Sequence, residues 1–83
     1  MNERGCFTIE ARWEQTHESP TLSTFYLIEQ IGGSLDEAKS ITQTYFRRHV
    51  AASSSCLEWV EGVYEKSRCW YAHTGPITFR ITA

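Results

Sequence analysis

Histidine and aspartate are the side chains with which a search for catalytic chemistry in this chain begins. The three histidines, His17, His49 and His73, fall in a polar loop, on the apolar half of an expected helix and beside an expected turn. A hydrolase triad needs a base oriented beside a nucleophile. The one aspartate, Asp36, lies at a helix start, where capping accounts for it. We therefore expect no enzyme; the catalytic alternative is a small nuclease with a histidine as acid and base.

The cysteines are odd in number and show no paired close spacing: Cys6, Cys56 and Cys69. A disulfide framework is therefore not expected. Cys69 and His73 are four residues apart, which on a strand puts them on one face but too far apart for easy shared ligation. The sequence predicts buried thiols, with no metal site and no cofactor.

Four arginines raise the possibility of nucleic-acid binding. Arg47 and Arg48 form a small basic cluster near the end of the expected helix, while Arg12 and Arg80 fall on strands whose polar residues would share one sheet face. The formal net charge of −2, with both signs interspersed, argues against an electrostatic nucleic-acid binder. Arg47 and Arg48 also complement the helix dipole. A small nucleic-acid-binding accessory protein is thus the second hypothesis for function.

Aromatic and acidic residues in the last third of the chain suggest protein binding. Tryptophan and tyrosine commonly anchor interfaces, and acidic side chains can compete for the arginines and lysines that bind phosphate. Alternation along a strand sends Trp70 and Tyr71 to opposite faces, although such rings could also simply complete a thin core. The candidate partner-binding residues are Glu58, Glu61, Glu65, Trp59, Tyr64, Trp70 and Tyr71.

A helix must position part of this chemistry. Ser34 and Glu37 have the spacing of a capping box at its start, and the serine run at 53–55 favours an end near Ala51 or Ala52. At about 100° per residue one apolar half collects Leu35, Ala38, Ile41, Thr42, Tyr45, Phe46, His49 and Val50. The helix is therefore amphipathic and buries one side.

Alternating apolar and polar residues predict strands on both sides of this helix. A frayed start is expected at residues 1–5, Gly32 and Gly33 are expected to turn the chain into the helix, and Lys66 with Ser67 is expected to form a hairpin turn. The expected strands are residues 7–14, about 22–30, 57–64, 68–73 and 77–82.

The elements together predict one α+β domain over residues 1–83. Their order is ββαβββ, which suggests a mainly antiparallel five-stranded sheet with the helix packed on one face. On the other face Thr8, Glu10, Arg12, Thr78 and Arg80 can face water. No signal peptide or membrane-spanning run is visible, so a cytoplasmic protein with reduced thiols is expected.

The stretches Leu57-Glu58-Trp59, Cys69-Trp70-Tyr71-Ala72 and Thr74-Gly75-Pro76-Ile77-Thr78-Phe79-Arg80-Ile81, after a Ser34-Leu35-Asp36-Glu37-Ala38 helix start, resemble those of short α+β proteins of bacteriophages and prophages. The resemblance is one of layout and covers the second two-thirds of the chain. Such proteins include host-takeover factors and inhibitors of bacterial defence, among them anti-CRISPR proteins. No site residue can be carried over from the group.

The leading hypothesis is therefore a non-enzymatic, phage-type protein in the host-cell cytoplasm. It would bind and inhibit a bacterial, defence-related protein or nucleoprotein complex. A third hypothesis is a homodimer formed through an exposed strand edge or the open sheet face.

Overall fold

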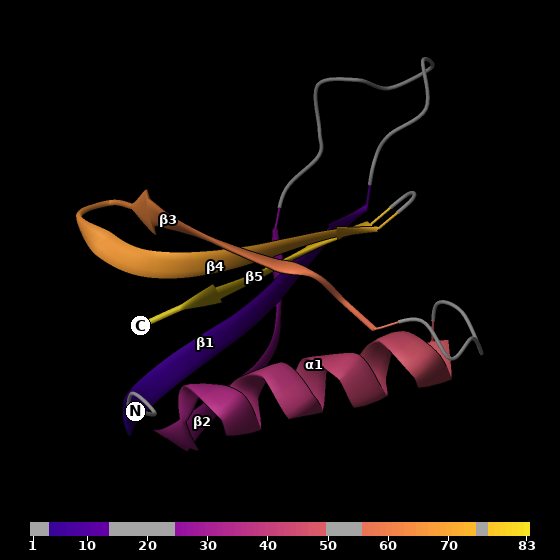
Figure 1. The fold of residues 1–83 in the computed structure, drawn as a ribbon, viewed down its shortest axis with the longest axis horizontal. Helices are drawn as coiled ribbons and strands as arrows, with labels where there is room; N and C mark the ends of the chain where they lie inside the picture. The colour runs from indigo at the N-terminus through magenta and orange to yellow at the C-terminus, as the bar shows by residue number, and fades with distance from the viewer. Residues whose placement is uncertain (1–3, 14–24, 50–55, 75–76) are drawn as a thin grey trace.

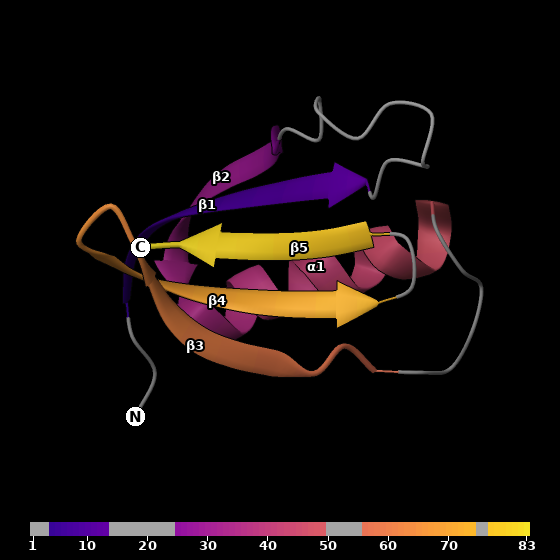
Figure 2. The ribbon, with the colours of Figure 1, turned by 90° about the horizontal axis from the view of Figure 1, so that it is seen from above.

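The fold is α+β with the order ββαβββ, as the sequence predicts. A computed structural model describes residues 4–13, 25–49, 56–74 and 77–83. One sheet with the strand order β2-β1-β5-β4-β3, antiparallel at every pairing, lies over one helix (Figures 1 and 2). The elements are β1 (Arg4–Trp13), β2 (Tyr26–Ser34), α1 (Leu35–His49), β3 (Trp59–Tyr64), β4 (Ser67–Thr74) and β5 (Ile77–Thr82).

Helix α1 begins with the predicted capping box. The amide of Glu37 donates to Ser34 Oγ and the amide of Ser34 donates to Glu37 Oε1, each over 3.1 Å. These two bonds satisfy amides that the first turn leaves without helical partners. The predicted helix end at Ala51 or Ala52 lies outside the described residues. Within the described ranges no helix combines the length and apolar character that a membrane crossing requires.

The core lies between α1 and one face of the sheet. Ile77, Phe79 and Ile81 of β5 are fully buried there, and the rings of Phe46 and Phe79 meet edge to face with centroids 6.2 Å apart. Thr42, a buried polar residue of α1, donates its hydroxyl to the carbonyl of Ala38 over 2.8 Å, so its burial leaves no unsatisfied donor. The helix half that the sequence marks as apolar is thus the packed side as far as Phe46, whereas His49 is exposed and Val50 lies outside the described residues.

The first hairpin is longer than predicted at the helix end. Arg4 pairs with Ser34, and Gly5 pairs with Gly33, so the predicted fray is wrong for Arg4 and Gly5. Gly32 and Gly33 lie within β2 and not in a turn, because Ser34 ends the strand and caps the helix at once. The predicted beginning of β2 at residues 22–24 is outside the described ranges.

The turn between β3 and β4 lies one residue earlier than predicted. Glu65 and Lys66 both have positive φ, at 49° and 69°, which is the geometry of a two-residue type I′ turn. Tyr64 and Ser67 flank this turn as a pair, and the register stays regular along β3. The right-handed twist that such a turn favours suits a tight antiparallel hairpin.

Candidate functional site

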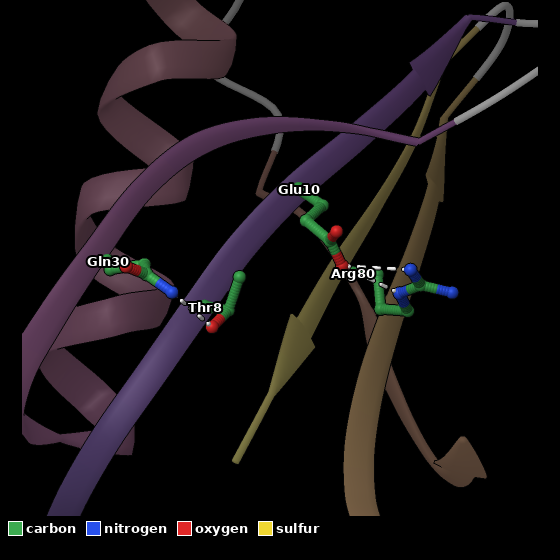
Figure 3. A network of polar contacts seen from close by, with 4 residues as sticks. All are labelled: Thr8, Glu10, Gln30 and Arg80. Carbon is green, nitrogen blue, oxygen red and sulfur yellow. Dashed lines mark hydrogen bonds and ion pairs between the residues drawn. The ribbon is translucent and has the colours of Figure 1, made fainter. Parts of the chain in front are cut away.

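Arg80 is at the centre of the sheet face opposite α1, which we call the outer face. Its Nε and Nη2 donate to Glu10 Oε1 over 3.0 and 2.8 Å (Figure 3). The rings of Phe25 and Tyr64 each lie with their centroid 3.9 Å from its Cζ. The expectation that Arg80 faces water is therefore wrong: two rings cover the guanidinium, and the residue is 6% exposed.

The charge of Arg80 is held within the fold. Burial lowers the pKa of Arg80, but the hydrogen bonds and charge of Glu10, with further contributions from Tyr71 and Tyr64, outweigh burial and leave this pKa above its usual value. A hydrogen bond with Cys69 and burial raise the pKa of Tyr71, while Arg80 opposes the rise. Such a network of contacts holds these side chains in place.

Other polar side chains of the outer face also bond to each other. Gln30 Nε2 donates to Thr8 Oγ1 over 3.3 Å (Figure 3), and Thr78 Oγ1 contacts His73 Nδ1. Thr78 is buried, so it too is wrongly expected to face water. In the part of the chain that the structure describes, no group of acidic, cysteine and histidine side chains could hold a metal ion.

The second feature of note is an exposed edge strand. β3 ends the sheet and pairs with β4 alone among the described strands, while α1 packs mainly against β1, β2 and β5. Val60 and Val63 are 67% and 72% exposed and, by alternation, lie on opposite faces. We call the following residues the β3 edge surface: Glu58, Val60, Glu61, Val63, Tyr64 and Glu65.

Two arginines fix side chains of this surface. Arg80 stacks against Tyr64 on the outer face. Arg68 Nε and Nη2 both lie 2.9 Å from Glu61 Oε2, and its guanidinium carbon is 5.2 Å from the centre of the Trp70 ring. The edge is therefore exposed but has ordered side chains.

The structure divides the predicted partner-binding aromatics into two groups. Trp70 is 4% exposed in the core, edge to face with Phe7, and Trp59 packs against the core. Trp70 therefore cannot meet a partner without unfolding. Tyr64 and Tyr71 lie on the outer face, whereas Glu58, Glu61 and Glu65 are exposed along the strand and its turn.

The four arginines of the nucleic-acid hypothesis do not share one surface. Arg47 and Arg48 are exposed in the last turn of α1. Arg12 and Arg80 lie on the outer face, where both guanidinium groups stack on Phe25. The sheet separates the two pairs, so a single nucleic acid strand could not contact all four on one continuous face.

Val60 and Val63 are functional candidates that the sequence interpretation missed. Their signal is that two valines of opposite parity flank Glu61-Gly62, so that apolar side chains occupy both faces of one strand. Only the strand order makes this informative, because a central strand of the same sequence would bury both.

No protein-family model matches the chain, and comparisons with curated proteins and with solved structures find no significant match. The function must therefore be inferred from the chain's own residues and their arrangement.

Proposed function

We propose that the chain is a non-enzymatic interaction protein that binds and inhibits a bacterial protein or nucleoprotein complex through the β3 edge surface. The observation that carries this proposal is the exposure of Val60 and Val63 on an edge strand. Proteins usually protect exposed strand edges, because an unpaired edge invites another chain. An exposed edge strand that carries apolar side chains is thus a candidate for a partner's contact.

The charges of the surface support a basic partner. Glu58, Glu61 and Glu65 are exposed just before, within and just after the strand. Complementary charge steers association and selects partners. A protein that uses arginine or lysine to bind phosphate would offer such charge. The resemblance to small phage proteins favours an inhibitor, and the target proposed here is a defence-related protein of the host cytoplasm.

Binding can be tested by capture from a nuclease-treated bacterial lysate, with three tagged proteins side by side. The triple variant Glu58→Gln, Glu61→Gln, Glu65→Gln removes the acidic groups at nearly constant shape. The control, Arg47→Gln with Arg48→Gln, removes the exposed basic pair of α1. We expect the wild type and the control to capture one stoichiometric protein, and the triple variant to bind it roughly tenfold more weakly, about 1.4 kcal/mol.

The same comparison tests the nucleic-acid hypothesis. If nuclease abolished capture, or if the arginine variant lost binding while the triple variant kept it, function would lie with Arg47 and Arg48. A binding constant that falls steeply with salt on nucleic acid would agree with that outcome.

Inhibition can be distinguished from catalysis by titration of the captured partner's activity. A blocking protein reduces activity in proportion to its amount and reaches its limit at equal molar amounts. Loss of activity at small substoichiometric amounts would instead indicate turnover and would contradict a non-enzymatic inhibitor.

A further inference from the structure

Some peptide groups of β3 point away from the sheet, toward the side on which none of the described strands pairs with it. The amide of Ala83, just after β5, donates to the carbonyl of Arg68 over 3.1 Å. In an antiparallel sheet a residue turns its N–H and C=O to the same neighbour, so the peptide groups of Arg68 point toward β5. Val63 is opposite Arg68 across β3 and β4. The N–H and C=O of Val63 therefore point to the open side.

This assignment extends along the strand by alternation. Glu61 and Trp59 share the parity of Val63 and also turn their peptide groups outward. The geometry of the hairpin leads to the same assignment. The residues that flank a two-residue turn form a hydrogen-bonded pair, and here these residues are Tyr64 and Ser67, so the next residue, Val63, turns its peptide groups outward. β3 thus presents a regular set of donors and acceptors at Trp59, Glu61 and Val63.

The opposite edge lacks this regularity. β2 has a register shift where Ile28 lies between the pairs Glu10 with Leu27 and Ile9 with Glu29. A bulge of this kind twists a strand and interrupts pairing, and it is one device that protects an edge. β3 keeps one register from Trp59 to Tyr64. Of the two edges, β3 is therefore the better template for another strand.

Charge selects the occupant of this edge. An antiparallel second copy centred on Glu61 would place two glutamates directly opposite, and like charges in that position destabilise pairing. In other registers the two copies still bring Glu58, Glu61 and Glu65 of both chains to one interface. A lysine or arginine opposite Glu61 could instead pair with its carboxylate, because the Glu61 side chain is 53% exposed.

We infer that β3 accepts an extended, basic segment of a partner protein as an added strand. The strand's peptide groups bond to Trp59, Glu61 and Val63, its apolar side chains contact Val60 and Val63, and a basic side chain contacts Glu61. The inference rests on the proposed function and specifies how the partner is recognised.

A pair of variants at one position isolates the backbone contribution. Val63→Pro removes an outward N–H without removing a bond to β4, and proline is tolerated on an edge where its missing N–H faces outward. Val63→Ala loses most of the same side chain and keeps the N–H. The probe is a capped peptide of about seven residues, the length of one strand, with the sequence Lys-Val-Val-Lys-Val-Val-Lys. When its central lysine lies opposite Glu61, a valine two positions away lies opposite Val63, and the valines next to the lysine lie on the face of Val60. A glutamate-valine peptide is its control.

Binding is measured by amide chemical shifts of the labelled full chain. We expect the lysine peptide to shift the amides of Glu61 and Val63 and to bind about tenfold more tightly than the acidic peptide, a difference well outside ordinary error. Val63→Pro should weaken binding about tenfold relative to Val63→Ala. Methylation of the peptide amides that face β3 should abolish binding to the wild type, which repeats the test without altering the protein.

Four results would overturn the inference. In the first two, the peptide shifts amides elsewhere on the chain, or the proline and alanine variants bind the peptide with equal affinity. In the other two, the wild type shows no binding at about 1 mM peptide, or the chain self-associates through β3 and the peptide does not displace the second copy. If strand addition failed in this way while the captured partner stayed sensitive to loss of the three glutamates, the proposed function would stand. If no protein were captured, the proposed function itself would fail.

Discussion

Strands β5 and β3 differ in what surrounds them, and the difference separates residues that stabilise the fold from residues that we propose bind a partner. β5 lies between β1 and β4 and buries five successive residues, Ile77 to Ile81. β3 pairs with β4 alone among the described strands and exposes four of its six residues. A strand that contributes little buried area can be changed without unfolding the domain. The arrangement therefore allows β3 to contact a partner while the core around β5 stays unchanged.

The largest expected contrast is between one core residue of β5 and one edge residue of β3. Phe79→Ala should lower the free energy of unfolding by about 3–5 kcal/mol because it leaves a cavity under α1. Val63→Ala should change it by less than about 0.5 kcal/mol. Urea unfolding of both variants measures the two values. Similar losses in the two variants would show that β3 belongs to the core.

A second contrast is between the arginines of the same two regions. Arg80→Ala should cost about 3 kcal/mol, because Glu10 would lose its partner in a largely buried setting. Arg68→Ala should cost less than about 1 kcal/mol, because its pair with Glu61 is half exposed. The two losses are compared by chemical denaturation at one salt concentration. A loss for Arg68→Ala as large as that for Arg80→Ala would contradict the division.

The smallest expected effect concerns Tyr71, which lies on β4 between Arg80 and Val60. Its pKa is raised from 10.0 by the hydrogen bond with Cys69 and by burial, so the fold favours the neutral phenol. The resulting stability is full below pH 10.0 and is lost as the pH rises through the raised pKa. Tyr45 has a pKa raised chiefly by a hydrogen bond with Tyr26 and shifts in the same direction.

Unfolding measured from neutral to alkaline pH should therefore show stability falling above pH 10.0, and Tyr71→Phe should make that fall shallower. Tyr45→Phe should have a similar but separate effect. If Tyr71→Phe left the alkaline fall unchanged, the raised pKa of the Tyr71 hydroxyl would not contribute to that fall.

Local signals predict most of the fold. Ser34 and Glu37 encode the helix start within four residues, and the alternation around Phe79 encodes a strand with one buried face. These features depend on neighbours in the sequence. The same local reasoning fails at Gly32 and Gly33, where pairing with β1 keeps glycines in a strand.

The candidate site depends on contacts between residues distant in sequence. Arg80 meets Glu10, 70 residues away, only because β5 lies beside β1. The exposure of Val60 depends in the same way on β3 being an outer strand. The glutamates of the candidate site can be predicted from the sequence composition. Strand order, which decides whether a strand lies in the core or at the edge of the sheet, is not a local property of the sequence.

The most direct test of the account measures the affinity of the purified captured partner for two matched variants. Val60→Arg places a positive charge on the β3 edge surface, and Leu27→Arg places one on β2, where Leu27 is 57% exposed. Both sites are exposed, so stability should change by less than about 0.5 kcal/mol in each. Isothermal titration should show about tenfold weaker binding for Val60→Arg and wild-type binding for Leu27→Arg. Unchanged binding by Val60→Arg, or a loss confined to Leu27→Arg, would contradict the assignment of function to β3.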